Sequence, residues 1–164
     1  MTTLVLARHA KSDWGSPALG DHDRPLNGRG MCDAPVMAAR LTARLADAGV
    51  RLDALLSSTA LRAKTTAGFF GAALGLELEL DEGLYGASAR TLLAAATARG
   101  VASVMIVAHD PGMTVLASTL SVDGIAHMPT CAVATFTWDA DDWDVATATD
   151  PDHWSFDSPG TPAR

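Results

Sequence analysis

Residues 104–112 read VMIVAHDPG, and this stretch decides the fold class. The continuous apolar run from Val104 to Ala108 is typical of a parallel strand that is covered on both faces. His109 and Asp110 follow directly, and Pro111 then offers the start of a helix that we expect to run to about residue 120. A buried strand, a polar pair and a helix in immediate succession predict one unit of an α/β fold.

Two other apolar runs, at residues 4–7 and 54–56, repeat this pattern. Helical patterns cover residues 34–49, 59–74 and 88–100, and each ends near a glycine. Pro35 conflicts with a helix that starts at Asn27, because proline removes an internal hydrogen bond. The helix therefore either kinks at Pro35 or starts afresh with Asp33 as its cap.

The C-terminal part of the chain changes to an alternating pattern. Residues 132–138 and 143–147 flank a polar turn and predict a hairpin. Residues 150–164 contain three prolines and are predicted to form an irregular C-terminal tail. The order of these elements implies a single domain over residues 1–164, built as a three-layer α/β/α sandwich with a mostly parallel central sheet.

Charge and composition exclude several classes of function. The chain of 164 residues has 12 Lys and Arg against 19 Asp and Glu, so its net charge of −7 disfavours nucleic acid and anionic membranes as partners. Cys32 and Cys131 do not make a disulfide framework, and no Cys/His cluster has zinc spacing, so we expect no metal. No apolar run is long enough for a signal peptide or a membrane span, which predicts a cytoplasmic protein.

Polar side chains follow two of the predicted strands. Arg8 and His9 end the first apolar run, and His109 ends the later one. In open α/β sheets ligands bind beyond the carboxyl ends of the strands, so the two histidines are expected to face one crevice. A lone histidine at a strand end is most simply a satisfied polar residue. Arg8 argues against that simple interpretation, because an arginine at a buried strand end needs an anionic partner.

The chain resembles the histidine phosphatase (phosphoglycerate mutase-like) superfamily. The matching segments occur in the family's order at residues 4–10, 23–30, 57–66, 84–85 and 106–113. Residues 128–130 resemble the compact SixA-type phosphohistidine phosphatase branch. Ala10 stands where the family usually has glycine, so the loop after His9 carries an additional methyl group.

The resemblance implies a role for each matched residue. His9 would be the nucleophile that forms a phosphohistidine, which water then hydrolyses. Arg8 and Arg62 would bind the phosphoryl oxygens, and Arg24 is a further candidate for substrate binding. His109, protonated beside the phosphoryl dianion, would stabilise the same charge from the opposite strand. No cofactor is implied.

Two carboxylic acids are candidates for protonating the leaving group. Asp110 directly follows His109, as in the acid phosphatase branch of the superfamily, whereas compact relatives more often have asparagine there. Glu82 lies in a segment that resembles the one carrying the acid in the mutase branch. We expect Asp110 to be the acid, with Glu82 as the alternative.

The resemblance predicts a metal-independent phosphatase that acts on phosphohistidine carried by another protein. Only about a dozen residues separate the second helix from Ser88, which leaves little chain for a lid over the site. A small-molecule phosphomonoesterase is the alternative enzyme, because Asp110 would help a poor leaving group. A non-catalytic phosphate-binding module is the alternative outside enzymes, although a binder has no need of a nucleophilic imidazole.

Overall fold

Four adjacent parallel strands make up one side of the six-stranded sheet that organises this protein, from one edge inwards. The computed structural model describes residues 1–162. The elements are β1 (Thr2–Arg8), η1 (Asp21–Asp23), α1 (Gly28–Asp47), β2 (Ala54–Ser58), α2 (Leu61–Leu74), β3 (Leu78–Asp81), η2 (Glu82–Leu84), α3 (Ala89–Thr97), β4 (Ser103–Ala108), α4 (Gly112–Leu120), β5 (Val133–Trp138), α5 (Trp143–Ala146) and β6 (His153–Asp157). The α/β class predicted from the sequence is confirmed.

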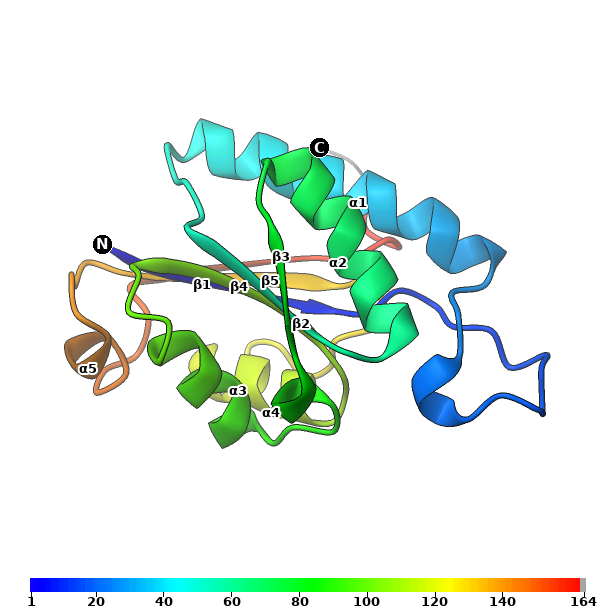
Figure 1. Ribbon diagram of the computed structural model, residues 1–164. Coiled ribbons are helices and arrows are strands. Elements are labelled where there is room, and N and C mark those ends of the chain that lie inside the picture. Colours follow the sequence, from blue (N-terminus) through cyan, green and yellow to red (C-terminus); the bar gives the residue numbers. More distant parts are fainter. Residues whose placement is uncertain (163–164) are drawn as a thin grey trace.

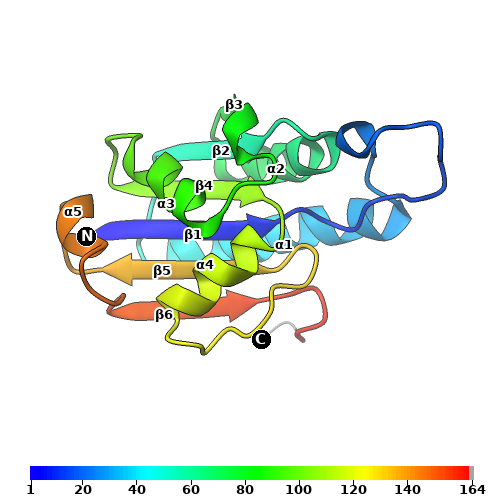
Figure 2. The same ribbon diagram turned by 90° about the horizontal axis from the view of Figure 1, so that it is seen from below.

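The strand order in the sheet is β3-β2-β4-β1-β5-β6. β4 pairs in parallel with both β1 and β2, and β2 pairs in parallel with β3. β5 runs antiparallel to β1, and β6 runs antiparallel to β5 (Figure 2). The carboxyl ends of β1, β4 and β2 therefore lie side by side at one edge of the sheet.

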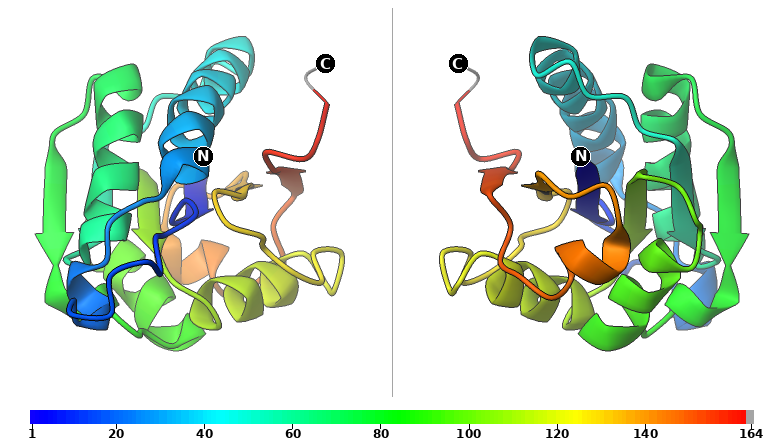
Figure 3. Two further views of the ribbon diagram at one scale, coloured as in Figure 1. Left: turned by 90° about the vertical axis from the view of Figure 1, so that its right-hand side faces the viewer. Right: turned by 90° about the vertical axis from the view of Figure 1, so that its left-hand side faces the viewer.

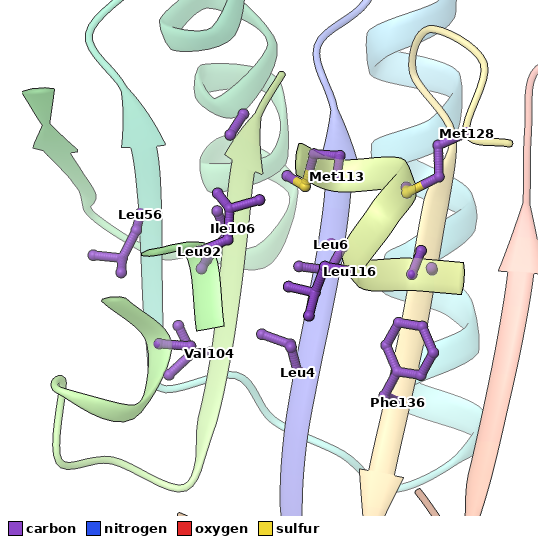
Figure 4. Close-up of a cluster of buried hydrophobic side chains, with 14 of the residues drawn as sticks. Leu4, Leu6, Leu56, Leu92, Val104, Ile106, Met113, Leu116, Met128 and Phe136 are labelled. Atoms are coloured by element: carbon purple, nitrogen blue, oxygen red, sulfur yellow. The ribbon is translucent and has the colours of Figure 1, made fainter. Parts of the chain in front are cut away.

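Helices cover both faces of this sheet. α1 and α2 lie on one face, and α3 and α4 lie on the other (Figure 1), so the three layers are visible from the side (Figure 3). The period-two alternation of β1 divides the core accordingly. Leu4 and Leu6 pack with the residues of α3 and α4 (Figure 4), whereas Val5 and Ala7 pack with those of α1 and α2. Burial on both faces of the sheet therefore explains why the central strands have continuous apolar sequences.

The start of α1 resolves the conflict at Pro35. The Asn27 side chain accepts a hydrogen bond from the Gly30 N–H at 2.9 Å, and the helix continues through Pro35 to Asp47. Asn27 rather than Asp33 is therefore the cap. Ser88 caps α3 as predicted, by accepting from the Thr91 N–H at 3.2 Å.

The prediction for the C-terminal part was wrong in two respects. Residues 143–146 form the short helix α5 rather than the second strand of a hairpin, because the Asp142 carboxylate caps the Asp144 N–H at 2.6 Å. Residues 153–157 are the strand β6, so the tail at 150–164 is not wholly irregular. β6 is a mostly exposed edge strand, so it lacks the apolar run that would reveal it in the sequence. Residues 163 and 164 of the predicted tail lie outside the described residues.

None of the helices within residues 1–162 combines the length and the apolar character that crossing a membrane requires.

Candidate active site

The two histidines predicted from the strand ends lie together at the carboxyl edge of the sheet. The His9 N–H donates to the Ala108 carbonyl at 3.1 Å, which joins the ends of β1 and β4. The centroids of the His9 and His109 rings are 5.1 Å apart, and each residue is 7% exposed. Both imidazoles are therefore close to each other and almost completely removed from solvent.

One ring nitrogen of His9 is fixed by the backbone. His9 Nδ1 lies 2.7 Å from the Ala10 carbonyl oxygen, and a carbonyl can only accept. Nδ1 therefore carries the hydrogen, and the neutral ring has its lone pair at Nε2. The loop is held from both sides: the Ala10 N–H donates to Thr66 Oγ1 at 3.0 Å, and the Cys131 N–H donates to the His9 carbonyl at 3.0 Å. The fully buried Ala10 methyl packs in the core beneath α1 and α2, which accommodates its departure from the family's glycine.

His109 has one satisfied nitrogen and one unsatisfied nitrogen. Its Nε2 lies 2.8 Å from Ser58 Oγ at the end of β2. Its Nδ1 is buried and has no hydrogen-bond partner among the described residues. The edge of the Tyr85 ring packs against the imidazole, with 5.5 Å between the centroids. A buried imidazole nitrogen without a partner favours a ligand at this place.

Both histidines are held in their neutral form. The pKa of His9 is lowered to about 4, mainly by burial; the hydrogen bond to the Ala10 carbonyl opposes this shift, and the positive charges of Arg62, Arg8 and Arg24 add to it. The pKa of His109 is lowered to about 3, mainly by burial, with the neighbouring His9 imidazole and the positive charge of Arg62 acting in the same direction. A phosphoryl dianion between the two rings would raise both pKa values, because opposite charge favours the protonated form.

Arg8 and Arg62 each have an open edge. A guanidinium has five N–H donors and binds an oxyanion through two parallel bonds along one edge. Arg62 Nη1 donates a hydrogen bond to the Asp21 carbonyl at 2.6 Å, and Arg62 Nη2 donates to the Asp21 carboxylate at 3.0 Å. Arg8 Nη1 donates a hydrogen bond to the Met128 carbonyl at 2.8 Å, and Asp110 Oδ2 lies 3.2 Å from the same nitrogen. The Nε atoms of both arginines are buried without a partner within residues 1–162. The Nε side of each guanidinium is thus free to bind an oxyanion.

Arg24 differs from the other two arginines because its edge is occupied. Its Nε and Nη2 both donate to Asp21 Oδ1, at 3.2 and 2.8 Å, and its Nη1 donates to Ser12 Oγ at 2.8 Å. The Trp14 ring covers the guanidinium, with 3.5 Å between its centroid and Cζ. Arg24 is buried, and its charge acts on the pKa of His9, so it belongs to the cluster around His9.

Sequence reasoning missed Asp21. This aspartate lies in η1 and contacts Arg24, Arg62 and the Tyr85 hydroxyl, which donates to Asp21 Oδ2 at 2.6 Å. Its spacing of three residues from Arg24 is the available local signal. Arg62 and Tyr85 are 41 and 64 residues away in the sequence, so their contacts could not be foreseen.

The two candidate acids have different surroundings. Asp110 Oδ1 accepts from the Thr114 N–H at 3.0 Å and from Thr114 Oγ1 at 2.9 Å, while Oδ2 pairs with Arg8. Glu82 is exposed at the start of η2. The structure therefore brings Asp110 into the cluster and leaves Glu82 in contact with solvent. Within residues 1–162, no three His, Cys, Asp or Glu side chains group as metal ligands would.

Similar proteins agree with this architecture. The profile of the histidine phosphatase superfamily (branch 1) matches residues 4–91. An uncharacterized protein of Mycobacterium tuberculosis strain H37Rv is 35% identical over 116 residues, which cover 70% of this chain and 69% of that protein.

Two solved structures are similar over nearly the whole chain. The Agrobacterium tumefaciens protein assigned as the phosphohistidine phosphatase SixA has a TM-score of 0.78 and 29% identity, over 97% of this chain and 99% of that one. The protein histidine phosphatase SixA complexed with tungstate has a TM-score of 0.72 and 25% identity, over 96% and 97% of the two chains. The resemblance seen in the sequence is confirmed: the chain belongs to the histidine phosphatase superfamily, branch 1, and is a phosphatase of the SixA type.

Proposed function

We propose that this phosphatase acts through a phosphohistidine on His9, without a metal, and that its substrate is phosphohistidine carried by another protein. One observation supports the first part above all. The hydrogen bond from Nδ1 to the Ala10 carbonyl leaves the lone pair of His9 at Nε2, in a cluster with the open edges of Arg8 and Arg62.

The proposed reaction has two steps. His9 Nε2 attacks phosphorus in line, a P–N bond forms, and the bond between phosphorus and the substrate's leaving atom breaks. Water then attacks the phosphohistidine, which releases inorganic phosphate and returns the neutral imidazole. Arg8 and Arg62 bind the phosphoryl oxygens in both steps.

His109 supports the same charge in this proposal. The approaching dianion raises the pKa of His109, so the ring takes up a proton and carries a hydrogen on both nitrogens. Nε2 then donates to Ser58, and the buried Nδ1 donates to a phosphoryl oxygen. Arg24 adds positive charge, and its acidic partner Asp21 fills the edge that would otherwise bind phosphate.

The open surroundings of the site support a substrate on a protein. The connection from β3 to α3 at this edge consists only of residues 82–88. Tyr85 is 40% exposed and Trp14 is 73% exposed, so the two aromatic side chains line the rim rather than close over the cluster. A phosphorylated histidine on a protein surface can reach such a site, whereas a small sugar phosphate binds best in a concave pocket. The likeness to SixA structures supports the same substrate class.

A small-molecule phosphomonoesterase is the second candidate, and Asp110 is the observation that favours it. Its carboxylate lies beside Arg8, where a proton donor for an alkoxide leaving group would be useful.

A substrate panel in the presence of EDTA tests the proposal. Phosphohistidine peptides, para-nitrophenyl phosphate and sugar phosphates are compared by kcat/KM, with His9→Ala as the inactive control. We expect the phosphohistidine peptide to be the best substrate and chelation to have no effect. A sugar phosphate turned over with the highest kcat/KM would contradict the substrate assignment, and activity lost in EDTA and restored by magnesium would contradict the mechanism.

A further inference from the structure

The structure assigns Asp21 as a positioning residue of this site, which orients Arg62 for the phosphoryl group. The inference rests on the proposed phosphatase chemistry at His9. Asp21 is half exposed, yet its carboxylate contacts three side chains: Arg24, Arg62 and Tyr85. It comes from η1, Arg62 from the first turn of α2 and Tyr85 from the segment before α3, so one carboxylate joins three elements that border the site.

The pattern of donors shows how Asp21 orients Arg62. Asp21 accepts hydrogen bonds from both Nη atoms of Arg62, one at its backbone carbonyl and one at its carboxylate. Because a guanidinium is planar, two contacts at its Nη end fix the direction of the whole group. Among residues 1–162, the buried Nε of Arg62 has no hydrogen-bond partner, so its edge can still bind an oxyanion. An aspartate that competed with phosphate would occupy that edge, as Asp21 does on Arg24.

Tyr85 connects Asp21 to His109. Its hydroxyl donates to Asp21, and the edge of the same ring packs on the His109 imidazole. The Tyr85 hydrogen bond is the main cause that holds the pKa of Asp21 far below its usual value, and the hydrogen bond from Arg24 adds to it. Asp21 therefore stays ionised throughout the working range of pH. The Tyr85 hydroxyl thus influences the arginines through Asp21.

The negative charge of Asp21 separates two possible roles, positioning of an arginine and direct electrostatic attraction of the substrate. Asp21 is negative, so its removal makes the site more positive and cannot weaken attraction of a phosphate dianion through charge alone. Loss of Asp21 is therefore expected to leave KM unchanged or lower. Without the Asp21 carboxylate, Arg62 loses its alignment with the transition state, so the loss is expected in kcat.

The test compares Asp21→Asn with Asp23→Asn, which makes the same charge change in the same short helix. Asp23 is exposed, and its ion-pair contact is with His22 at 3.6 Å. Turnover of para-nitrophenyl phosphate is measured per folded molecule, with the folded fraction taken from urea denaturation. We expect kcat of Asp21→Asn to fall at least ~10-fold without a rise in KM, because misplaced groups lower rates by one to two orders of magnitude. Asp23→Asn should stay within about twofold of the wild type.

A double-mutant cycle gives the readout that a merely structural role would not produce. Tyr85→Phe keeps the ring on His109 and removes the hydroxyl, so we expect a smaller loss of kcat than in Asp21→Asn. The same change in the Asp21→Asn background should have no further effect, because the hydroxyl acts through Asp21. If Asp21→Asn does not fold, Tyr85→Phe alone decides the question, and a kcat equal to that of the wild type refutes the inference.

Three other outcomes would overturn the assignment. Equal kcat values for Asp21→Asn and Asp23→Asn would show that Asp21 has no part in the site. A lower KM with unchanged kcat in Asp21→Asn would show that Asp21 competes with phosphate. Full additivity of the two changes would show that Tyr85 acts independently. A wild-type enzyme without any turnover would instead refute the proposed function, which is a separate result.

Discussion

In the proposed reaction, His9 and His109 are both uncharged before the substrate arrives. The sequence indicated which residues these are, because both directly follow apolar strands. It could not indicate their charge state, which depends on burial and on arginines distant in the sequence. A neutral nucleophile with its lone pair at Nε2 needs no base to activate it.

The lowered pKa values predict an acid-sensitive fold. Between pH 6.5 and about 4, unfolded His9 binds a proton that folded His9 does not, and for His109 the range extends to about 3. The free energy of unfolding must therefore fall as the pH falls through this range. NMR titration of the free protein should show two histidines with midpoints well below 6.5, identified by their loss in His9→Ala and His109→Ala. Midpoints near 6.5 for these two residues would contradict the neutral site.

Asp110 has contacts that favour a role in holding Arg8. Both oxygens of the Asp110 carboxylate already have partners, because Oδ2 pairs with Arg8 and Oδ1 accepts from the Thr114 N–H. We therefore expect Asp110→Asn to lower kcat/KM for phosphohistidine, aryl and alkyl phosphates by similar factors, about 10-fold for one charge-assisted contact. The acid role inferred from the sequence stays a prediction, and a loss confined to alkyl phosphates would establish it. Glu82→Gln, measured on the same panel, tests the exposed alternative.

At the scale of elements, the site depends on how the loop after β1 packs against the start of α1. The Asn27 N–H donates to the Lys11 carbonyl at 3.0 Å, and a Cβ added at Gly30 would lie 2.2 Å from the same oxygen. The start of α1 therefore packs directly against the backbone of the segment that follows His9. The sequence offered Asn27 as a helix start, but the requirement for glycine at position 30 appears only in the tertiary structure.

Two glycines in the first turn of α1 provide a matched comparison. Gly30→Ala forces the Lys11 backbone to move, so we expect it to destabilise the fold by about 1–3 kcal/mol and to reduce kcat. A Cβ at Gly28 would meet no atom of residues 1–162 within 4 Å, so Gly28→Ala should be neutral or slightly stabilising. Urea denaturation and steady-state kinetics measure both effects. Equal stability and activity in the two variants would show that the contact with Lys11 is unimportant.

For the whole molecule, the sequence predicted the centre of the fold better than its edge. Strands buried on both faces have continuous apolar runs, so β1, β2 and β4 were recognisable. The exposed strand β6 has no such run, and the helix α5 depends on the cap at Asp142, so the predicted hairpin and irregular tail were wrong. The His9 to His109 pair followed from topology, whereas Asp21 escaped notice because its partners are distant in the sequence.

The charge distribution reconciles an acidic molecule with an anionic ligand. The chain carries −7 overall. Among the residues that the structure describes, Arg8, Arg24 and Arg62 pair only with Asp21 and Asp110, so one positive charge remains beside neutral histidines. The local field rather than the net charge attracts the phosphoryl group.

The most direct measurement is the site and isomer of the covalent intermediate. The enzyme is mixed with a radioactively phosphorylated substrate, quenched within milliseconds and mapped by proteolysis. Because Nδ1 of His9 is bound to the Ala10 carbonyl, the label should be acid-labile and alkali-stable, should lie on Nε2 of His9 and should be absent in His9→Ala. A label that persists in His9→Ala, or turnover by the wild type through a direct attack of water with no labelled enzyme, would contradict the account.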